Sequence, residues 1–293
     1  MKILEYEAKA LLVGQGLRVP AGQLAMGSEE AEAVARRLGR PVVIKAQVPA
    51  TGRMKAGGIR FAATPEEAGL AAGELLGAKV RGYSVGAILV EERLESIAEI
   101  YVGVTYDSQE QMAVLLAANA GGVEVESRGH VAPRYFSMLA GYPDHLSREA
   151  AAELGLEGGA LVRLAAIITR LAGCFAQWDS ILLEINPLIL DSNGEWWLAD
   201  AHLELDDDAA YRQAPLLAQV PASARLRDQR SEFERRAAEI DNADHRGVAG
   251  RLVSFGGDLG LLIGGGGASL TIMDAVLDAG LSLQRPDLQR RMI

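Results

Sequence analysis

The chain has 293 residues, of which 49% are hydrophobic and 23% charged, the composition of an ordinary globular protein with room for about two domains. Its net charge of −10 and pI of about 5.0 argue against nucleic acid as the main partner, so any anion site must be a local basic island. Cys174 is the only cysteine, which excludes a disulfide framework, and its apolar surroundings predict a buried structural thiol.

The first residues, MKILEYEAKALL, have the pattern of a short amphipathic helix and not that of a signal peptide. No apolar run reaches the length expected of a transmembrane helix. We therefore expect a cytoplasmic protein that uses neither a membrane nor a nucleic acid as its partner.

The first 118 residues are predicted to form both helices and strands. The predicted helices are 6–15, 29–38 and 65–76. The predicted strands are 42–45, 59–61, 84–91, 99–106 and 111–118. Ser28 and Thr64 are good N-caps for the second and third helices, and Pro65 fits the first helical position of the third.

The rest of the chain continues the mixed pattern. We expect, in order, helices within 149–178 broken at glycines 155, 158 and 159, two apolar strands around a turn within 182–205, a polar helical connector over 215–246, strands over 248–263 and a helix over 270–278. These elements predict the α/β class.

A basic, glycine-rich loop lies between the strand that ends at Lys45 and the strand that begins after Gly58. Three cations and three glycines fall within the 14 residues from Lys45 to Gly58, including Gly52 and Arg53. Glycines let backbone N–H groups approach phosphate oxygens, and Arg and Lys supply the countercharge. The pattern predicts either a polyphosphate site or a surface hairpin with solvated cations.

A second hairpin, LLEINPLIL-DSNG-EWWLADAHLEL, brings polar residues together inside strongly apolar strands. If residues 192–194 form a three-residue loop with Gly194 left-handed, Asn186 faces Asp200 and Glu184 faces His202. An amide oxygen beside a carboxylate is an oxygen-rich site of the kind that Mg²⁺ takes alongside nucleotide phosphates. The alternatives are a solvated polar sheet face, or a two-residue loop that shifts the pairing by one.

Two further features carry weaker signals. Glu91 ends an apolar strand and Glu99 follows eight residues later, so each is either a surface acid or, at the strand end, a ligand for ribose hydroxyls. The segment Gly264–Ser269 lacks the lysine of a phosphate-binding P-loop. It is either a tight turn or a helix N-terminus that presents N–H groups to an anion.

Together the motifs resemble the β subunit of succinyl-CoA synthetase, a carboxylate–CoA ligase of the ATP-grasp family, over residues 1 to about 280. The matching segments are LEYEAKALL, VIKAQVPATGRMKAGG, ILVEERLESIAEIYVG, GGVEVE at 121–126, EINPL and LADAHLEL. The resemblance implies a two-lobed α+β ATP-grasp domain over residues 1–240, with a lid lobe at about 20–95. A partial flavodoxin-like α/β domain follows over residues 245–293.

The resemblance also implies roles for individual residues. Lys45 would contact the nucleotide phosphates, and the loop of Gly52, Arg53 and Met54 would close over them. Glu91 would hold the ribose or hinge, with Leu94 and Glu99 as further nucleotide contacts. Asn186 and Asp200 would bind Mg²⁺. Because catalysis in such enzymes is positioning and charge neutralisation, Lys45 and Arg53 are the expected catalytic residues.

The implied reaction uses Mg²⁺ and ATP, or GTP, to phosphorylate a histidine of a CoA-binding α subunit in a heterodimer or heterotetramer. The phosphoryl group then passes to a carboxylic acid, and CoA displaces it to form a thioester.

Three positions depart from the family pattern. Met54 replaces the second glycine of the usual Gly-Arg-Gly-Lys loop, which lowers the expected flexibility. His202 replaces a lysine. Gly264 stands where the family has an asparagine that touches the carboxylate substrate, which leaves room for malate, citrate or acetate in place of succinate.

The sequence also ends about one domain earlier than the family pattern, at the basic segment SLQRPDLQRRMI. Three hypotheses follow: an active ligase subunit, a ligase for another acid, or a truncated chain that binds Mg-ATP without passing the phosphoryl group on.

Overall fold

The computed structural model describes residues 1–119 and 133–223, the single positions 236, 239, 240 and 243, and residues 267–278. Contacts within the chain divide it into two units, Met1–Arg227 and Asp228–Ile293. The boundary expected from the sequence, at residues 240–245, lies further along the chain and stays a prediction.

The larger sheet of the first unit has seven strands, in the order β1-β13-β11-β8-β9-β10, with β12 also paired to β11. They are β1 (Lys2–Ile3), β8 (Ala98–Asp107), β9 (Met112–Ala118), β10 (Arg134–Phe136), β11 (Ser180–Leu190), β12 (Trp196–Leu198) and β13 (Ala201–Leu205). Every pair in this sheet is antiparallel. The helix α1 (Glu5–Gly14) follows β1 and packs against β13.

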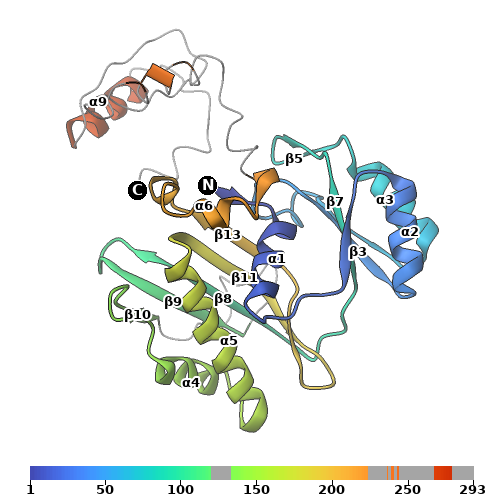
Figure 1. Ribbon diagram of the computed structural model, residues 1–293, viewed down its shortest axis with the longest axis horizontal. Coiled ribbons are helices and arrows are strands. Elements are labelled where there is room, and N and C mark those ends of the chain that lie inside the picture. Colours follow the sequence, from blue (N-terminus) through green and yellow to red (C-terminus); the bar gives the residue numbers. More distant parts are fainter. Residues whose placement is uncertain (120–132, 224–235, 237–238, 241–242, 244–266, 279–293) are drawn as a thin grey trace. The chain divides into compact units, whose positions relative to one another are not determined.

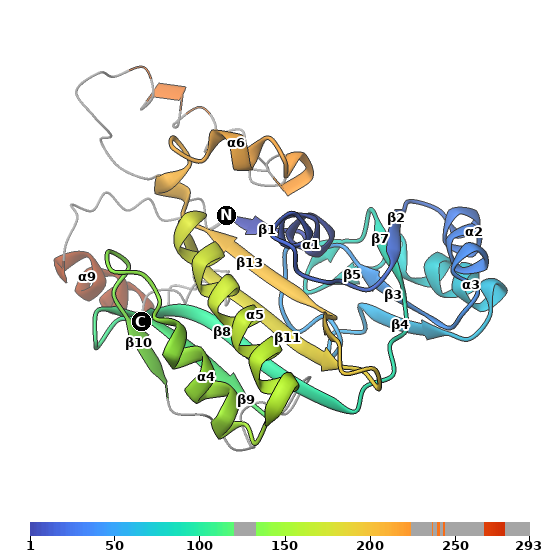
Figure 2. The same cartoon turned by 60° about the horizontal axis from the view of Figure 1, so that its bottom comes forward.

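Two helices, α4 (Asp144–Glu153) and α5 (Gly158–Gln177), cover one face of this sheet, as Figures 1 and 2 show. The buried side chains Leu164, Ile168, Leu171 and Phe175 recur at the helical period, so one stripe of α5 faces β8 and β11. The predicted helices thus exist, but the first begins at Asp144, five residues before the predicted start at 149.

The helix α5 corrects one expectation. By length and composition it could span a membrane, although the sequence led us to expect no run of that length. Its buried stripe packs in the core of the larger sheet, as in the core helix of a globular domain. Cys174 lies on this helix and is only 2% exposed, which confirms the predicted buried thiol.

The smaller sheet has four antiparallel strands in the order β2-β7-β3-β4. They are β2 (Gly22–Ala25), β3 (Val42–Ala46), β4 (Ile59–Ala62) and β7 (Ile88–Glu92), and a short hairpin of β5 (Lys79–Val80) and β6 (Tyr83–Ser84) accompanies them. The predicted strand 84–91 is therefore wrong as one element, because it divides between β6 and β7.

Two helices, α2 (Ser28–Leu38) and α3 (Pro65–Leu75), pack against each other and against the smaller sheet. Thr64 caps α3 as predicted, because its Oγ1 accepts a hydrogen bond of 3.2 Å from the Glu67 N–H. Ser28 does not cap α2: the N-cap is Gly27, so Ser28 is already the first helical residue. Arg36 and Arg37 in the last turn complement the helix dipole.

The hairpin between β11 and the strands β12 and β13 has the predicted register. Leu190 pairs with Trp196, and Glu184 pairs with His202. Gly194 is left-handed at φ +78°, as the three-residue loop requires. The two-residue alternative is therefore excluded, and the polar residues of both strands come to one place.

Beyond β13 the structure describes η2 (Asp207–Ala209), α6 (Ala214–Leu217) and α9 (Gly267–Asp278). The helix α9 begins three residues before the predicted start at 270. The predicted strands of 248–263, the motif at 121–126 and most of the predicted connector lie outside the described residues.

Candidate functional site

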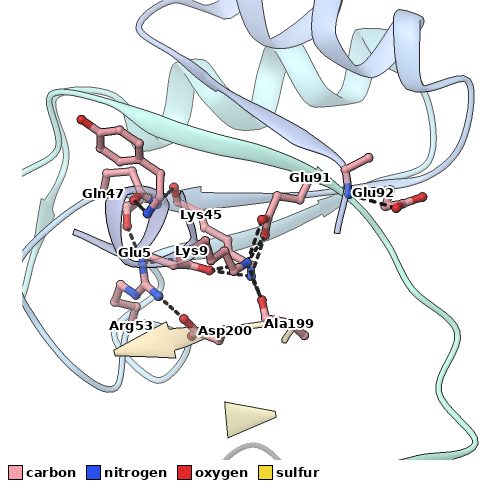
Figure 3. Close-up of polar contacts among 12 residues, drawn as sticks. Glu5, Lys9, Lys45, Gln47, Arg53, Glu91, Glu92, Ala199 and Asp200 are labelled. Atoms are coloured by element: carbon pink, nitrogen blue, oxygen red, sulfur yellow. Dashed lines mark hydrogen bonds and ion pairs between the residues drawn. The ribbon is translucent and has the colours of Figure 1, made fainter. Parts of the chain in front are cut away.

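A cluster of charged side chains lies where the smaller sheet meets α1 and the connection between β12 and β13 (Figure 3). The smaller sheet contributes Lys45 from β3 and Glu91 from β7, and the basic loop after β3 contributes Arg53. The helix α1 contributes Glu5 and Lys9, and Ala199 and Asp200 precede β13. All of the charged side chains but Asp200 are buried.

Two ammonium groups, of Lys9 and Lys45, share the same acceptors. Lys9 Nζ lies 2.9 Å from Glu5 Oε1, 2.7 Å from both Glu91 carboxylate oxygens and 2.7 Å from the Ala199 carbonyl oxygen. Lys45 Nζ lies 2.9 Å from Glu5 Oε1 and 2.9 Å from Glu91 Oε2, and it also donates to the Ala199 carbonyl. The carboxylates of Glu5 and Glu91 raise the pKa of Lys45 above its ordinary value despite its burial.

Arg53 connects the basic loop to the other carboxylates. Its Nη2 donates to Asp200 Oδ1 at 2.6 Å, and its Nη1 donates to the Ala46 carbonyl at 3.1 Å. Nη1 also lies 2.7 Å from Glu5 Oε2, an ion pair without hydrogen-bond alignment. Burial opposes the charge of Glu5, but Arg53 and the two lysines outweigh it and hold the pKa of that carboxyl well below its usual range.

The cluster is charge-balanced, with three cations and three carboxylates. The cations come close together only because the acids hold them there. An entering anion that competes for these cations would therefore meet groups already gathered at one point.

The basic loop is a compact turn. The Gly58 N–H donates to the Arg53 carbonyl at 2.7 Å, and the Gly57 N–H donates to the Met54 carbonyl at 3.1 Å. Gly52 has φ +65°, and a Cβ there would lie 2.9 Å from Arg81 Nη2, so a side chain at this position would be strained. The Met54 side chain is 49% exposed and stays outside the cluster.

Of the predicted metal ligands, Asp200 belongs to the cluster and Asn186 lies beside it. The Asn186 N–H donates to the Asp200 carbonyl at 3.3 Å, and Asn186 Nδ2 lies 3.4 Å from Glu184 Oε1. Burial raises the pKa of Glu184, and the nearby Asp200 carboxylate adds to the rise. The donor chemistry of Asn186 and Asp200 fits Mg²⁺. Within the described residues, no group of three or more His, Cys, Asp or Glu side chains could hold a metal by itself.

The structure thus brings together Lys45, Arg53, Glu91 and Asp200 in one network of ion pairs, and places Asn186 next to it. Two other predicted contacts take no part in these ion pairs: Leu94 lies in the connection after β7, half-buried, and the exposed Glu99 accepts a hydrogen bond of 3.1 Å from Ser96. The predicted substrate position, Gly264, lies outside the described residues.

Sequence reasoning missed two members of the cluster, Glu5 and Lys9. Their spacing of four suggests a surface ion pair on a helix. The signal that could have found them is the position of their neighbours, since Ala8 and Leu12 lie on the same face at i+3 and i+7 from Glu5 and are fully buried.

The family model for the ATP-grasp domain matches residues 2–190, which include most of the strands of both sheets. The succinate–CoA ligase [ADP-forming] β subunit of Chloroflexus aggregans is 34% identical over 96% of this chain and 72% of its own length. That of Methanothermobacter thermautotrophicus is 33% identical over 94% of this chain and 70% of its length. The chain therefore belongs to the family of succinate–CoA ligase β subunits.

Solved structures share the fold. ATP citrate lyase from Methanothrix soehngenii, in complex with citrate and coenzyme A, has a TM-score of 0.68 at 21% identity, covering 96% of this chain and 69% of that one. The dinucleotide-forming acetyl-coenzyme A synthetase 1 of Ca. Korarchaeum cryptofilum has a TM-score of 0.56 at 22% identity, covering 70% of this chain and 93% of that one.

Proposed function

We propose that this chain is the nucleotide-binding β subunit of an ADP-forming carboxylate–CoA ligase, active in the cytoplasm with a CoA-binding α subunit. The observation that carries the proposal is the gathering of Lys45 and Arg53 beside Asp200, within a fold and family whose members are such ligases.

Each residue of the proposed nucleotide site has a role that follows from its side-chain chemistry. Lys45 and Arg53 would neutralise the nucleotide phosphates, and the compact loop from Gly52 would cover them. Asn186 and Asp200 would hold Mg²⁺, which shields phosphate charge when bound. Glu91 would accept hydrogen bonds from the ribose hydroxyls. Leu94 and Glu99 remain proposed nucleotide contacts, and ATP or GTP would serve.

The overall reaction converts ATP, a carboxylic acid and CoA into ADP, phosphate and an acyl-CoA. In the first step a nitrogen of the α-subunit histidine forms a bond to the γ-phosphorus as the bond to the ADP oxygen breaks. The phosphoryl group then passes from the histidine to the carboxylate oxygen. Finally the CoA thiol attacks the acyl carbon, loses its proton and releases phosphate. This chain would position the nucleotide for the first step.

Calorimetric titration with ATP, with and without Mg²⁺, tests the nucleotide site directly. Lys45→Ala should weaken Mg-ATP binding on the order of 10- to 150-fold, the worth of a charge-assisted hydrogen bond. The matched control is Lys2→Ala, because Lys2 pairs with Glu204 outside the cluster. Equal affinity of Lys45→Ala and the control would remove Lys45 from the phosphate site.

A second candidate function is ligation of a different acid. Gly264 supports it, because glycine lacks the amide that the family uses to touch its substrate. With an α subunit present, ADP release in the presence of CoA and succinate, malate, citrate or acetate would separate the candidates. ADP release with succinate but with none of the other three acids would refute ligation of a different acid.

A further inference from the structure

Lys9 contacts the same acceptor groups as Lys45, the lysine proposed to bind phosphate. Both ammonium groups contact Glu5 Oε1, the Glu91 carboxylate and the Ala199 carbonyl. Figure 3 shows the two side chains converging on these groups from different directions. Either cation alone would therefore leave both carboxylates paired.

The two lysines differ in what holds them. Lys45 is the last residue but one of β3, the strand that leads into the basic loop. Lys9 stands on α1, whose other side is anchored: the Glu7 carboxylate accepts hydrogen bonds of 2.8 Å from the Ala222 N–H and 2.9 Å from the Ser223 N–H. Lys9 is thus fixed by the helix, whereas Lys45 belongs to the strand that leads into the loop.

Engaging a phosphate would draw the Lys45 ammonium from its present acceptors. Without another cation, Glu91 would then remain buried and unpaired, a strongly unfavourable state. Lys9 prevents this, because its bonds of 2.7 Å to both Glu91 oxygens do not depend on Lys45.

We propose that Lys9 is a positioning residue, a resident counterion for Glu5 and Glu91 that frees Lys45 to engage the nucleotide phosphates. This inference rests on the proposed function. It adds to the nucleotide site a residue that acts on Glu5 and Glu91 and does not touch the nucleotide. It also explains how this buried site accepts a polyanion: both glutamates keep a paired cation, Lys9, that does not leave.

The first test needs no nucleotide. Thermal unfolding is measured for Lys9→Met, Lys45→Met, the double variant and the control Lys2→Met. Because each lysine substitutes for the other, each single variant should lower Tm modestly, and the double variant should lower it by clearly more than the sum. Additive shifts would overturn the sharing of acceptors.

The second test is calorimetric titration with Mg-ATP. Lys9→Met should bind on the order of tenfold more weakly than the wild type, because Lys45 must then stay with the acids. Lys9→Arg should recover part of the affinity. Adding Glu5→Gln to Lys9→Met should also restore affinity, since one acid fewer needs a counterion. Circular dichroism establishes that each variant is folded.

The outcomes separate the two proposals. A wild-type chain that binds no Mg-ATP overturns the proposed function and this inference with it. Wild-type binding that Lys9→Met matches, or a Lys9→Met defect that neither Lys9→Arg nor Glu5→Gln relieves, overturns the inference alone.

Discussion

Cys174 offers a direct measure of the packing on which the site rests. It is 2% exposed, within the core cluster that α5 forms with the larger sheet. Burial raises the pKa of its thiol from 9 to about 11. The thiolate fraction at pH 8 therefore falls about 100-fold, and a thiol reagent should react only through opening of the core.

The informative perturbation is Leu171→Ala. Leu171 is 1% exposed and lies one turn before Cys174 in the same cluster. A Leu→Ala change in a close-packed core costs about 3 kcal/mol, because the cavity cannot fully collapse. If labelling follows unfolding, that cost raises the labelling rate about 150-fold.

The assay is the rate of thiol labelling of the native protein at pH 8. Val162→Ala is the matched control, since Val162 is an apolar residue on the same helix but 61% exposed, and its rate should stay close to that of the wild type. Mg-ATP at 100 times its Kd should slow labelling by about 100-fold, the effect of about 2.7 kcal/mol of added stability. Equal rates for Leu171→Ala and Val162→Ala would refute the assigned packing of α5.

Three further predictions concern the metal, a helix cap and pH. Asp200→Asn should abolish the Mg²⁺-dependent tightening of nucleotide binding seen by calorimetry, and its retention would remove Asp200 from the metal site. Thr64→Ala should lower the urea unfolding free energy by about 1 kcal/mol through the lost cap, whereas Ser28→Ala, which removes no cap bond, should not; equal losses would contradict this. Burial, aided by a nearby carboxylate, raises the pKa of Tyr101 from 10 to about 12, so its stabilisation is complete below pH 10 and is lost as pH rises toward 12. The unfolding free energy of the wild type should therefore fall by about 1 kcal/mol more than that of Tyr101→Phe between pH 9 and 11. Parallel plots of unfolding free energy against pH would show that Tyr101 does not contribute to this loss.

The second hairpin shows what the sequence could predict. Its register followed from one assumption, a left-handed Gly194, because turn type fixes the pairing of every residue along two strands. The sequence therefore predicts that Asn186 lies opposite Asp200, and in the structure the Asn186 N–H donates to the Asp200 carbonyl. The cap at Thr64 followed as well, since Pro65 marks the first helical position.

Other features could not be predicted because tertiary contacts decide them. Ser28 and Gly27 are both acceptable before a helix, and local sequence does not choose between them. Glu5 and Lys9 look like a solvated pair until Glu91 and the Ala199 carbonyl are brought to them from distant parts of the chain. The exposure of Glu99 likewise depends on which other elements cover its strand, and the sequence of the strand itself does not determine this.

The contacts of Lys9 with Ala199 and of Arg53 with Asp200 join residues separated by 190 and 147 positions. Chains emerge from the ribosome N-terminal end first. The basic loop and α1 are thus made long before the residues that complete the cluster. In a nascent chain whose β13 is still inside the ribosome, Lys9 and Arg53 would lack some of the partners that they have in the folded protein. Stabilisation of the nascent chain by nucleotide should therefore begin only once β13 has emerged.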